Sequence, residues 1–258
     1  MASERSTAGT VAVNGIRLGC RQSGDPDGVP VMLLHGSGSS ATTWDKFVPH
    51  LTAAGHRTIA VDLRWHATSA RPGSYSLTSL RDDVLGLLDA FELREAVLIG
   101  HSVGAYAALA AALHAPDRVV SLVLEDLAAP PREPGSTTRI NPFDAVKAVA
   151  GILTSGRDYE LRAVVTILRQ LSRPDPAWWA RLGDVTHPTL ILSGGPTSCI
   201  PPQRLADATA AIPYARLATI PVGHRVHSLA PAEFATEVLT FLAEPIAAAP
   251  LAAAPRRP

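Results

Sequence analysis

Short apolar segments alternate with helical segments along most of the 258-residue chain. The apolar segments are only a few residues long and lack the polar alternation of a half-exposed strand, which is typical of strands buried on both faces. The segments between them have helical periodicity; the stretch 77–91 places on one face Leu80, Val84, Leu87, Leu88 and Phe91. Because repeated strand–helix units build parallel sheets, the sequence predicts an α/β fold with a mostly parallel central sheet and helices on both faces.

The chain begins with a hairpin rather than a strand–helix unit. Asn14-Gly15 separates two strand-like runs, 10–13 and 16–22, and Asn-Gly is a residue pair that favours a two-residue hairpin turn. The strands expected after the hairpin are 30–36, 57–63, 96–100, 119–126, 189–194 and 215–220. The expected helices include 77–91, 103–114, 201–211 and 232–242.

The stretch 130–184 separates two expected strands by far more chain than a crossover helix needs. It contains a helical stretch, 145–172, followed by the adjacent Trp178 and Trp179. We interpret it as a helical cap inserted over the sheet of a single domain that spans 1–244. The Ala- and Pro-rich tail, 245–258, has no core-forming pattern, and we expect it to be disordered.

Composition excludes several classes of protein. Hydrophobic residues make up 47% of the sequence and charged residues 18%, so the chain can bury a substantial core. Lys plus Arg and Asp plus Glu number 23 each, a balance that offers no basic surface for nucleic acid or an anionic membrane. We see no signal peptide, no membrane-spanning apolar run, and no metal-ligand or disulfide spacing around Cys20 and Cys199. We therefore expect a cytoplasmic protein with a small-molecule substrate, no nucleic-acid or membrane partner, no metal and no cofactor.

The pattern G-x-S-x-G occurs once in a context that gives it chemical meaning. Residues 100–104 read GHSVG and connect an expected buried strand to an Ala-rich expected helix. In such a turn the serine hydroxyl is exposed, and the amide at the start of the new helix points toward a developing oxyanion. The sequence predicts Ser102 as a nucleophile and the Val103 amide as one oxyanion donor.

A Gly-rich loop, HGSGSS at 35–40, follows the expected strand 30–36. A loop at this place can supply the second oxyanion amide, from the residue after His-Gly. We expect Ser37 in that role, and we expect His35, Gly36 and His101 to line the substrate site or hold its loops. HGSGSS lacks the spacing of a phosphate-binding loop.

A histidine follows the last expected strand, in GHRVH at 223–227. A base at this point of the chain can fold back over the serine, in agreement with the order nucleophile, acid, base. The sequence predicts His224 as the base and leaves His227 as the alternative.

With these motifs the chain resembles the α/β-hydrolase superfamily, in the branch of small esterases, haloperoxidase-like enzymes and haloalkane dehalogenases. The resemblance covers about residues 10–243. It rests on HGSGSS, DLRWHATS, GHSVGA, APDRVVSLVLED and GHRVHSLAPAEF, with Trp44 at a position where many members have Trp. It implies a Ser–His–carboxylate triad in an α/β-hydrolase fold.

Two places depart from the family pattern. Trp65 and Ala67 replace the glycines of a DxRGHGxS-like stretch. Trp65 then either reshapes the substrate entrance or packs under the insertion. The usual acid loop reads GGPTSCIP at 194–201, where Thr197 stands at the acid position with Ser198 beside it and no carboxylate is present.

The resemblance suggests another source for the acid. In some members the acid comes from the end of the strand after the nucleophile helix, and here that strand ends in Glu125-Asp126. An ungapped match from Ser102 places Asp126 on that acid, with Glu125 or no acid as alternatives. Since side chains alternate along a strand, only one of the two can face the site.

Three functions remain open at this point. The first is a serine hydrolase of a small to medium hydrophobic carboxylic ester, thioester or lactone that works through an acyl-enzyme. The second is a non-hydrolytic lyase, epimerase or acyl transferase on the same fold, suggested by Trp65 and the missing acid. The third is a catalytically silent ligand-binding module, which the presence of Ser102 and His224 disfavours.

Overall fold

A computed structural model describes residues 7–133 and 158–244. The expected disordered tail, 245–258, and the first part of the expected cap, 134–157, lie outside the described residues. Among the described residues, no helix is long and apolar enough to cross a bilayer.

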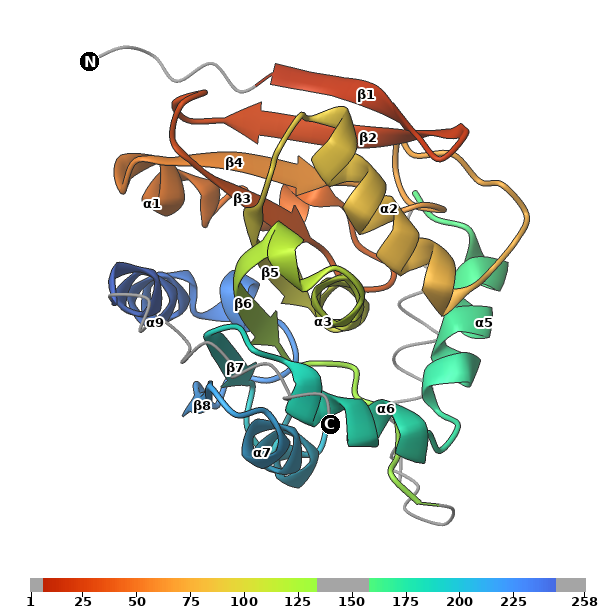
Figure 1. Ribbon diagram of the computed structural model, residues 1–258, viewed down its shortest axis with the longest axis vertical. Coiled ribbons are helices and arrows are strands. Elements are labelled where there is room, and N and C mark those ends of the chain that lie inside the picture. Colours follow the sequence, from red (N-terminus) through yellow and green to blue (C-terminus); the bar gives the residue numbers. More distant parts are fainter. Residues whose placement is uncertain (1–6, 134–157, 245–258) are drawn as a thin grey trace, which may run out of the picture.

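The described strands form one sheet in the order β1-β2-β4-β3-β5-β6-β7-β8 (Figure 1). The first two pairings, β1 with β2 and β2 with β4, are antiparallel, and all later neighbours are parallel. The mostly parallel sheet confirms the α/β prediction. The strands are β1 Thr7–Val13, β2 Ile16–Ser23, β3 Val29–Leu34, β4 His56–Val61, β5 Ala96–His101, β6 Val119–Glu125, β7 Thr189–Ser193 and β8 Ala215–Thr219.

The predicted hairpin is present at the N-terminal edge of the sheet. Val13 and Ile16 are paired across the turn, and Asn14 and Gly15 have φ angles of 49° and 77°. Both central residues of a type I′ turn need positive φ, which Asn and Gly tolerate best. The hairpin therefore forms where its turn residues favour it.

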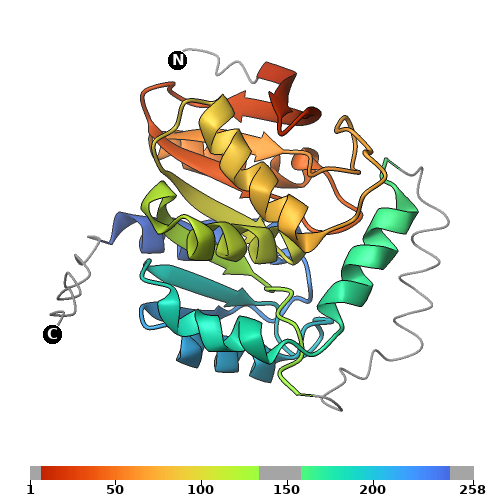
Figure 2. The same ribbon diagram turned by 45° about the vertical axis from the view of Figure 1, so that its right-hand side comes forward.

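Helices cover both faces of the sheet, and each face has its own apolar core (Figures 1 and 2). Met32 and Leu34 of β3 pack on the side of α2, α3 and α7, while Val31 and Leu33 pack on the side of α1 and α9. This alternation is why β3 is apolar throughout: a central strand with helices on both sides buries every side chain. The helices are α1 Val48–Ala53, α2 Leu77–Ala90, α3 Val103–His114, α5 Leu161–Leu171, α6 Pro176–Ala180, α7 Pro202–Ala211, α8 Val226–Leu229 and α9 Pro231–Ala243, with 3₁₀ turns η1 Ala41–Trp44, η2 Pro116–Arg118 and η3 Arg181–Asp184.

The described part of the insertion comprises α5, α6 and η3. Figure 2 shows α5 beyond the carboxyl ends of the parallel strands. Trp178 and Trp179 are buried: the Trp178 ring stacks on Tyr106 of α3, and the Trp179 indole N–H donates to the carbonyl of Pro130 at 2.9 Å. The two tryptophans thus anchor the insertion to the body of the domain.

Candidate active site

Ser102 lies on the tight turn between β5 and α3, with φ 52° and ψ −113°. A non-glycine residue rarely adopts positive φ, and such strain is typical of a nucleophile elbow. The turn is held from the next strand, because the Ser102 amide donates to the carbonyl of Glu125 at 2.8 Å. It also requires glycine two residues later, since a Cβ on Gly104 would lie 2.2 Å from the carbonyl oxygen of Leu34.

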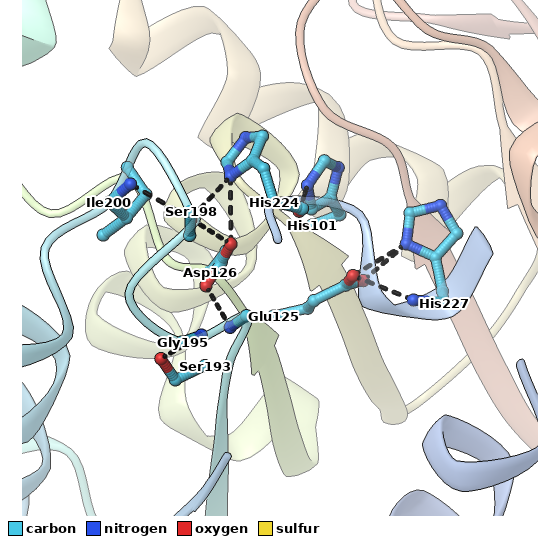
Figure 3. Close-up of polar contacts among 10 residues, drawn as sticks. His101, Glu125, Asp126, Ser193, Gly195, Ser198, Ile200, His224 and His227 are labelled. Carbon is cyan, nitrogen blue, oxygen red and sulfur yellow. Dashed lines mark hydrogen bonds and ion pairs between the residues drawn. The ribbon is translucent and has the colours of Figure 1, made fainter. Parts of the chain in front are cut away.

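His224 and Asp126 form a hydrogen-bonded pair at the carboxyl ends of the strands (Figure 3). The distance from His224 Nδ1 to Asp126 Oδ2 is 3.0 Å, and the Asp126 side chain is fully buried. The other carboxylate oxygen, Oδ1, accepts from the Gly194 amide at 2.8 Å. Asp126 thus fixes the ring from the Nδ1 side, which leaves Nε2 as the atom able to exchange a proton with a nucleophile.

The neighbouring acid forms a separate pair on the other side of the strand end. Glu125 Oε2 lies 2.6 Å from His227 Nδ1, and both side chains are fully buried. His227 Nε2 is 2.7 Å from the hydroxyl of Thr43, so both of its ring nitrogens have partners. Each acid at the end of β6 therefore has its own histidine, and the contacts favour Asp126 and His224 over Glu125 and His227.

His101 connects the elbow to the loop of His224. Its Nε2 lies 2.7 Å from the backbone oxygen of His224, and the two rings are 4.6 Å apart. Burial lowers the pKa of His101 to about 3, so the ring is neutral and donates its Nε2–H to that carbonyl. These contacts favour an orienting role for His101. Within the described part of the chain, no hydrogen bond joins the Ser102 hydroxyl to the His224 ring.

The two expected oxyanion residues line one cavity. Ser37 and Val103 border a cavity of about 10 Å³. Val103 opens α3, so its amide has no acceptor within the helix. Gly36 allows the loop to lie close to Ser102, because a Cβ there would lie 3.2 Å from the Ser102 Cβ. The rest of the cavity wall is mostly apolar and consists of Leu63, Trp65, His66, Leu80, Ala163, Val164 and Ile167.

Two buried neutral histidines hold the loop that carries Ser37. His35 Nε2 accepts from the Leu63 amide at 3.0 Å, and His66 Nε2 accepts from the Gly38 amide at 3.0 Å. Each ring therefore carries its proton on Nδ1, next to a carbonyl oxygen 2.7 Å or 2.9 Å away. Burial lowers the pKa of both rings, which favours this neutral form. His35 thus contributes to the site by holding the loop that carries Ser37.

Trp65, one of the departures from the family pattern, lies under the insertion and also borders the cavity. It is 1% exposed and has a φ of 72°, a conformation in which a bulky residue is strained. Its amide donates to Ala70 at 2.9 Å and its carbonyl accepts from Glu160 at 2.8 Å, so the turn is held on both sides. Trp65 therefore packs under the insertion, and its ring forms part of the cavity wall.

Comparison with known proteins decides the family. A model of the alpha/beta hydrolase fold matches residues 29–148. The RutD protein of Variovorax paradoxus is 30% identical over 257 residues, covering 85% of this chain and 94% of that protein. The chain belongs to the α/β-hydrolase fold family.

Other relatives of this α/β hydrolase differ in the reaction they are named for. An sn-1-specific diacylglycerol lipase of Mus musculus is 29% identical over 256 residues, 85% of this chain and 83% of that protein. An epoxide hydrolase of Caballeronia sordidicola is 40% identical over 111 residues, 42% of this chain and 33% of that protein. The crystal structure of a hydrolase from Pseudomonas aeruginosa PA01 superimposes with a TM-score of 0.76 at 26% identity, covering 92% of this chain and 99% of that one. The chain is thus a hydrolase of this family.

His224, the expected base, has a pKa that its surroundings shift. Burial works to lower the pKa of His224, but hydrogen bonds and charges from Asp126 and Cys199 outweigh it and raise the pKa from 6.5 to about 10. A raised pKa means that the folded protein favours the protonated ring. This contribution to stability is fully present below about pH 6.5 and is lost as the pH rises toward 10.

One polar residue of this site was missed at the sequence level. Ser198 Oγ lies 2.5 Å from Asp126 Oδ2 and 3.4 Å from His224 Nδ1 (Figure 3). The only signal in the sequence was its place beside Thr197, at the usual acid position. Its contact partner is 72 residues away, so the contact follows from the fold and not from a local pattern.

Proposed function

We propose that this α/β hydrolase cleaves a carboxylic ester, thioester or lactone with a small to medium hydrophobic acyl group, through an acyl-enzyme on Ser102. The observation that carries the proposal is the Asp126–His224 pair, set beside a strained serine elbow. A histidine oriented by a buried carboxylate is the base that a serine nucleophile needs.

In the proposed reaction, His224 Nε2 takes the hydroxyl proton of Ser102 while Ser102 Oγ attacks the carbonyl carbon. The carbonyl oxygen becomes an oxyanion, which the amides of Ser37 and Val103 bind. The intermediate collapses, and the alcohol or thiol leaves with the proton from His224. Water then attacks the acyl-enzyme in the same way and releases the acid.

The serine favours acyl substrates over epoxides, although partial relatives include epoxide hydrolases. Attack of a serine oxygen on an epoxide carbon would form an ether, which has no carbonyl group for water to attack. An acyl-enzyme has such a carbonyl and turns over. The diacylglycerol lipase relative, which covers most of the chain, is consistent with an ester substrate.

The apolar lining of the cavity supports the hydrophobic acyl group. Ala163, Val164 and Ile167 of α5 face Trp65 across a space next to the oxyanion residues. Because apolar walls select by shape, we propose that Trp65 and α5 set the acyl-chain preference.

An activity-based probe tests this function against the two alternatives. We expect a fluorophosphonate to label Ser102, with the adduct located by peptide mass spectrometry, and short p-nitrophenyl acyl esters to turn over. Labelling without turnover would favour the non-hydrolytic enzyme instead. If neither labelling nor turnover occurred, the ligand-binding alternative would hold.

The pH dependence of the esterase activity provides a further prediction. Only neutral His224 can accept the proton of Ser102, so kcat/KM rises as the ring loses its proton. Because Asp126 and Cys199 raise the pKa of His224 to about 10, we expect the acid limb to lie well above the ordinary histidine value of 6.5. The measurement is kcat/KM against pH for a p-nitrophenyl ester, corrected for spontaneous hydrolysis.

A cysteine variant separates the two causes of that shift. Cys199→Ala removes one group that raises the pKa of His224, so its acid limb should move to lower pH. Cys20→Ala is the matched control, because Cys20 is the other free cysteine and lies in β2, away from the pair. An acid limb at or below pH 6.5 in the unmodified protein would contradict the prediction.

A further inference from the structure

The carboxylate of Asp126 is surrounded by donors from the loop between β7 and α7. The Gly194 amide donates to Oδ1 at 2.8 Å, and the Ser198 hydroxyl donates to Oδ2 at 2.5 Å. His224 Nδ1 reaches the same Oδ2 at 3.0 Å. One carboxylate oxygen therefore receives two hydrogen bonds, one from the base and one from Ser198.

The Ser198 hydroxyl is itself fixed in one orientation. Its oxygen accepts from the Ile200 amide at 3.1 Å, and its backbone amide donates to the Gly195 carbonyl at 3.0 Å. Because a hydroxyl has a single proton, and Ser198 gives it to a carboxylate that has none to offer, the oxygen presents only lone pairs to His224. The 3.4 Å contact to His224 Nδ1 is then a second, weaker acceptor for the same ring proton.

Ser198 lies in the loop where the family usually has the triad acid. The loop GGPTSCIP lacks a carboxylate, but it still contributes a group to the histidine. A short hydrogen bond to a charged carboxylate is stronger than one between neutral groups, so Ser198 holds Asp126 in the rotamer that faces His224.

We propose that Ser198 is a positioning residue of the Asp126–His224 pair, which orients the carboxylate and shares the Nδ1 proton of the base. Ser198 has no part in bond making; it acts through Asp126. The proposal rests on the proposed function for its kinetic consequences, but the contacts and their effect on His224 exist without any substrate.

The test compares Ser198→Ala with Ser198→Thr, which keeps the hydroxyl. We expect Ser198→Ala to lower kcat by about tenfold to a hundredfold, the value of one hydrogen bond to a charged group, with little change in KM. Ser198→Thr should recover most of kcat. Thr197→Ala is the matched control, because Thr197 is an exposed hydroxyl residue next to Ser198 and aligns with the usual acid.

A second readout works without catalysis. In protein labelled with ¹³C-histidine, the NMR titration of His224 reports its own protonation. Without Ser198, the Asp126 carboxylate loses the contact that orients it and the Nδ1 proton loses its second acceptor, so the protonated ring is less stabilised. The pKa of His224 should therefore fall in Ser198→Ala and stay unchanged in Thr197→Ala. This measurement separates the role of Ser198 from the proposed ester hydrolysis. If the wild type hydrolysed no ester but Ser198→Ala still changed the pKa of His224 as expected, only the ester-hydrolase function would be rejected.

Two results would overturn the proposal. One is a His224 titration and a kcat in Ser198→Ala that both equal those of the wild type. The other is a Ser198→Thr variant as impaired as Ser198→Ala in a folded protein, which would make the site dependent on side-chain volume instead of the hydroxyl.

Discussion

Ser102→Ala is expected to lose esterase activity by a factor of thousands while keeping its fold. The alanine removes the only atom that forms the acyl bond, yet it leaves the oxyanion amides of Ser37 and Val103 in place. Residual activity above the uncatalysed rate is therefore expected. The measurement is kcat/KM for a p-nitrophenyl ester together with circular dichroism to confirm folding.

A second buried serine provides the control for this result. Ser121 lies in β6 and is 5% exposed, so Ser121→Ala makes the same change in the core without touching the elbow. It should retain activity and labelling by a fluorophosphonate. Unchanged turnover in Ser102→Ala would remove this serine from the reaction.

Local patterns were sufficient to predict the elements of this fold. The Asn14-Gly15 turn, the apolar strand β5 and the helix α3 each follow from residues adjacent in sequence. The predicted strands, and the predicted helices 77–91, 103–114, 201–211 and 232–242, agree with the described elements to within a few residues. The short helices α1 and α8 were not predicted. The parallel sheet followed because repeated strand–helix units have few other ways to bury their apolar faces.

Contacts between distant residues could not be predicted in this way. His66 accepts from the amide of Gly38, 28 residues earlier in the chain. His227 contacts Glu125 and Thr43, each more than a hundred residues away in sequence. Nothing in the local sequence marks a histidine as a loop anchor, because its partner is set by the packing of separate elements. The role of Ser198 was missed for the same reason.

The choice between the two acids was open in sequence and depends on geometry. Glu125 is the last residue of β6, whereas Asp126 lies just beyond it with a φ of 42°. Their side chains diverge, one toward His227 in the core and one toward His224 (Figure 3). Burial favours the protonated form of Glu125, but its contacts with His227, which include hydrogen bonds from the ring Nδ1 and the backbone amide, lower its pKa. Glu125 therefore stays charged and pairs within the core.

The two acids therefore have different expected effects when neutralised. Glu125→Gln breaks a fully buried pair, and its main cost should be stability, about 3–5 kcal/mol in the free energy of unfolding. Glu125→Gln that remains folded should keep most of its acylation rate, since its partner His227 has its ring nitrogens engaged by Glu125 and Thr43 and makes no hydrogen-bond contact with Asp126 or Ser102 among the described residues. Glu125→Gln is therefore the matched control for Asp126→Asn.

Asp126→Asn should keep the fold and lose roughly a thousandfold or more in acylation rate, in line with the large loss known for this substitution in Ser–His–Asp triads. The amide is similar in size to the carboxylate, and its oxygen can still accept from Gly194. Facing His224 and Ser198, however, it would present an N–H₂ donor to two groups that are themselves donors. The ring would then lose both its orientation and the negative charge that stabilises its protonated form.

Acylation can be measured directly from the rate of fluorophosphonate labelling, so the result does not depend on the choice of ester. The acid limb gives a second measure: without the charge of Asp126, the pKa of His224 should fall and activity that remains should appear at lower pH. Near-normal labelling in Asp126→Asn would refute the triad. If Glu125→Gln lost labelling while folded and Asp126→Asn did not, the acid would be Glu125, and His227 would have to be the base despite having both ring nitrogens engaged.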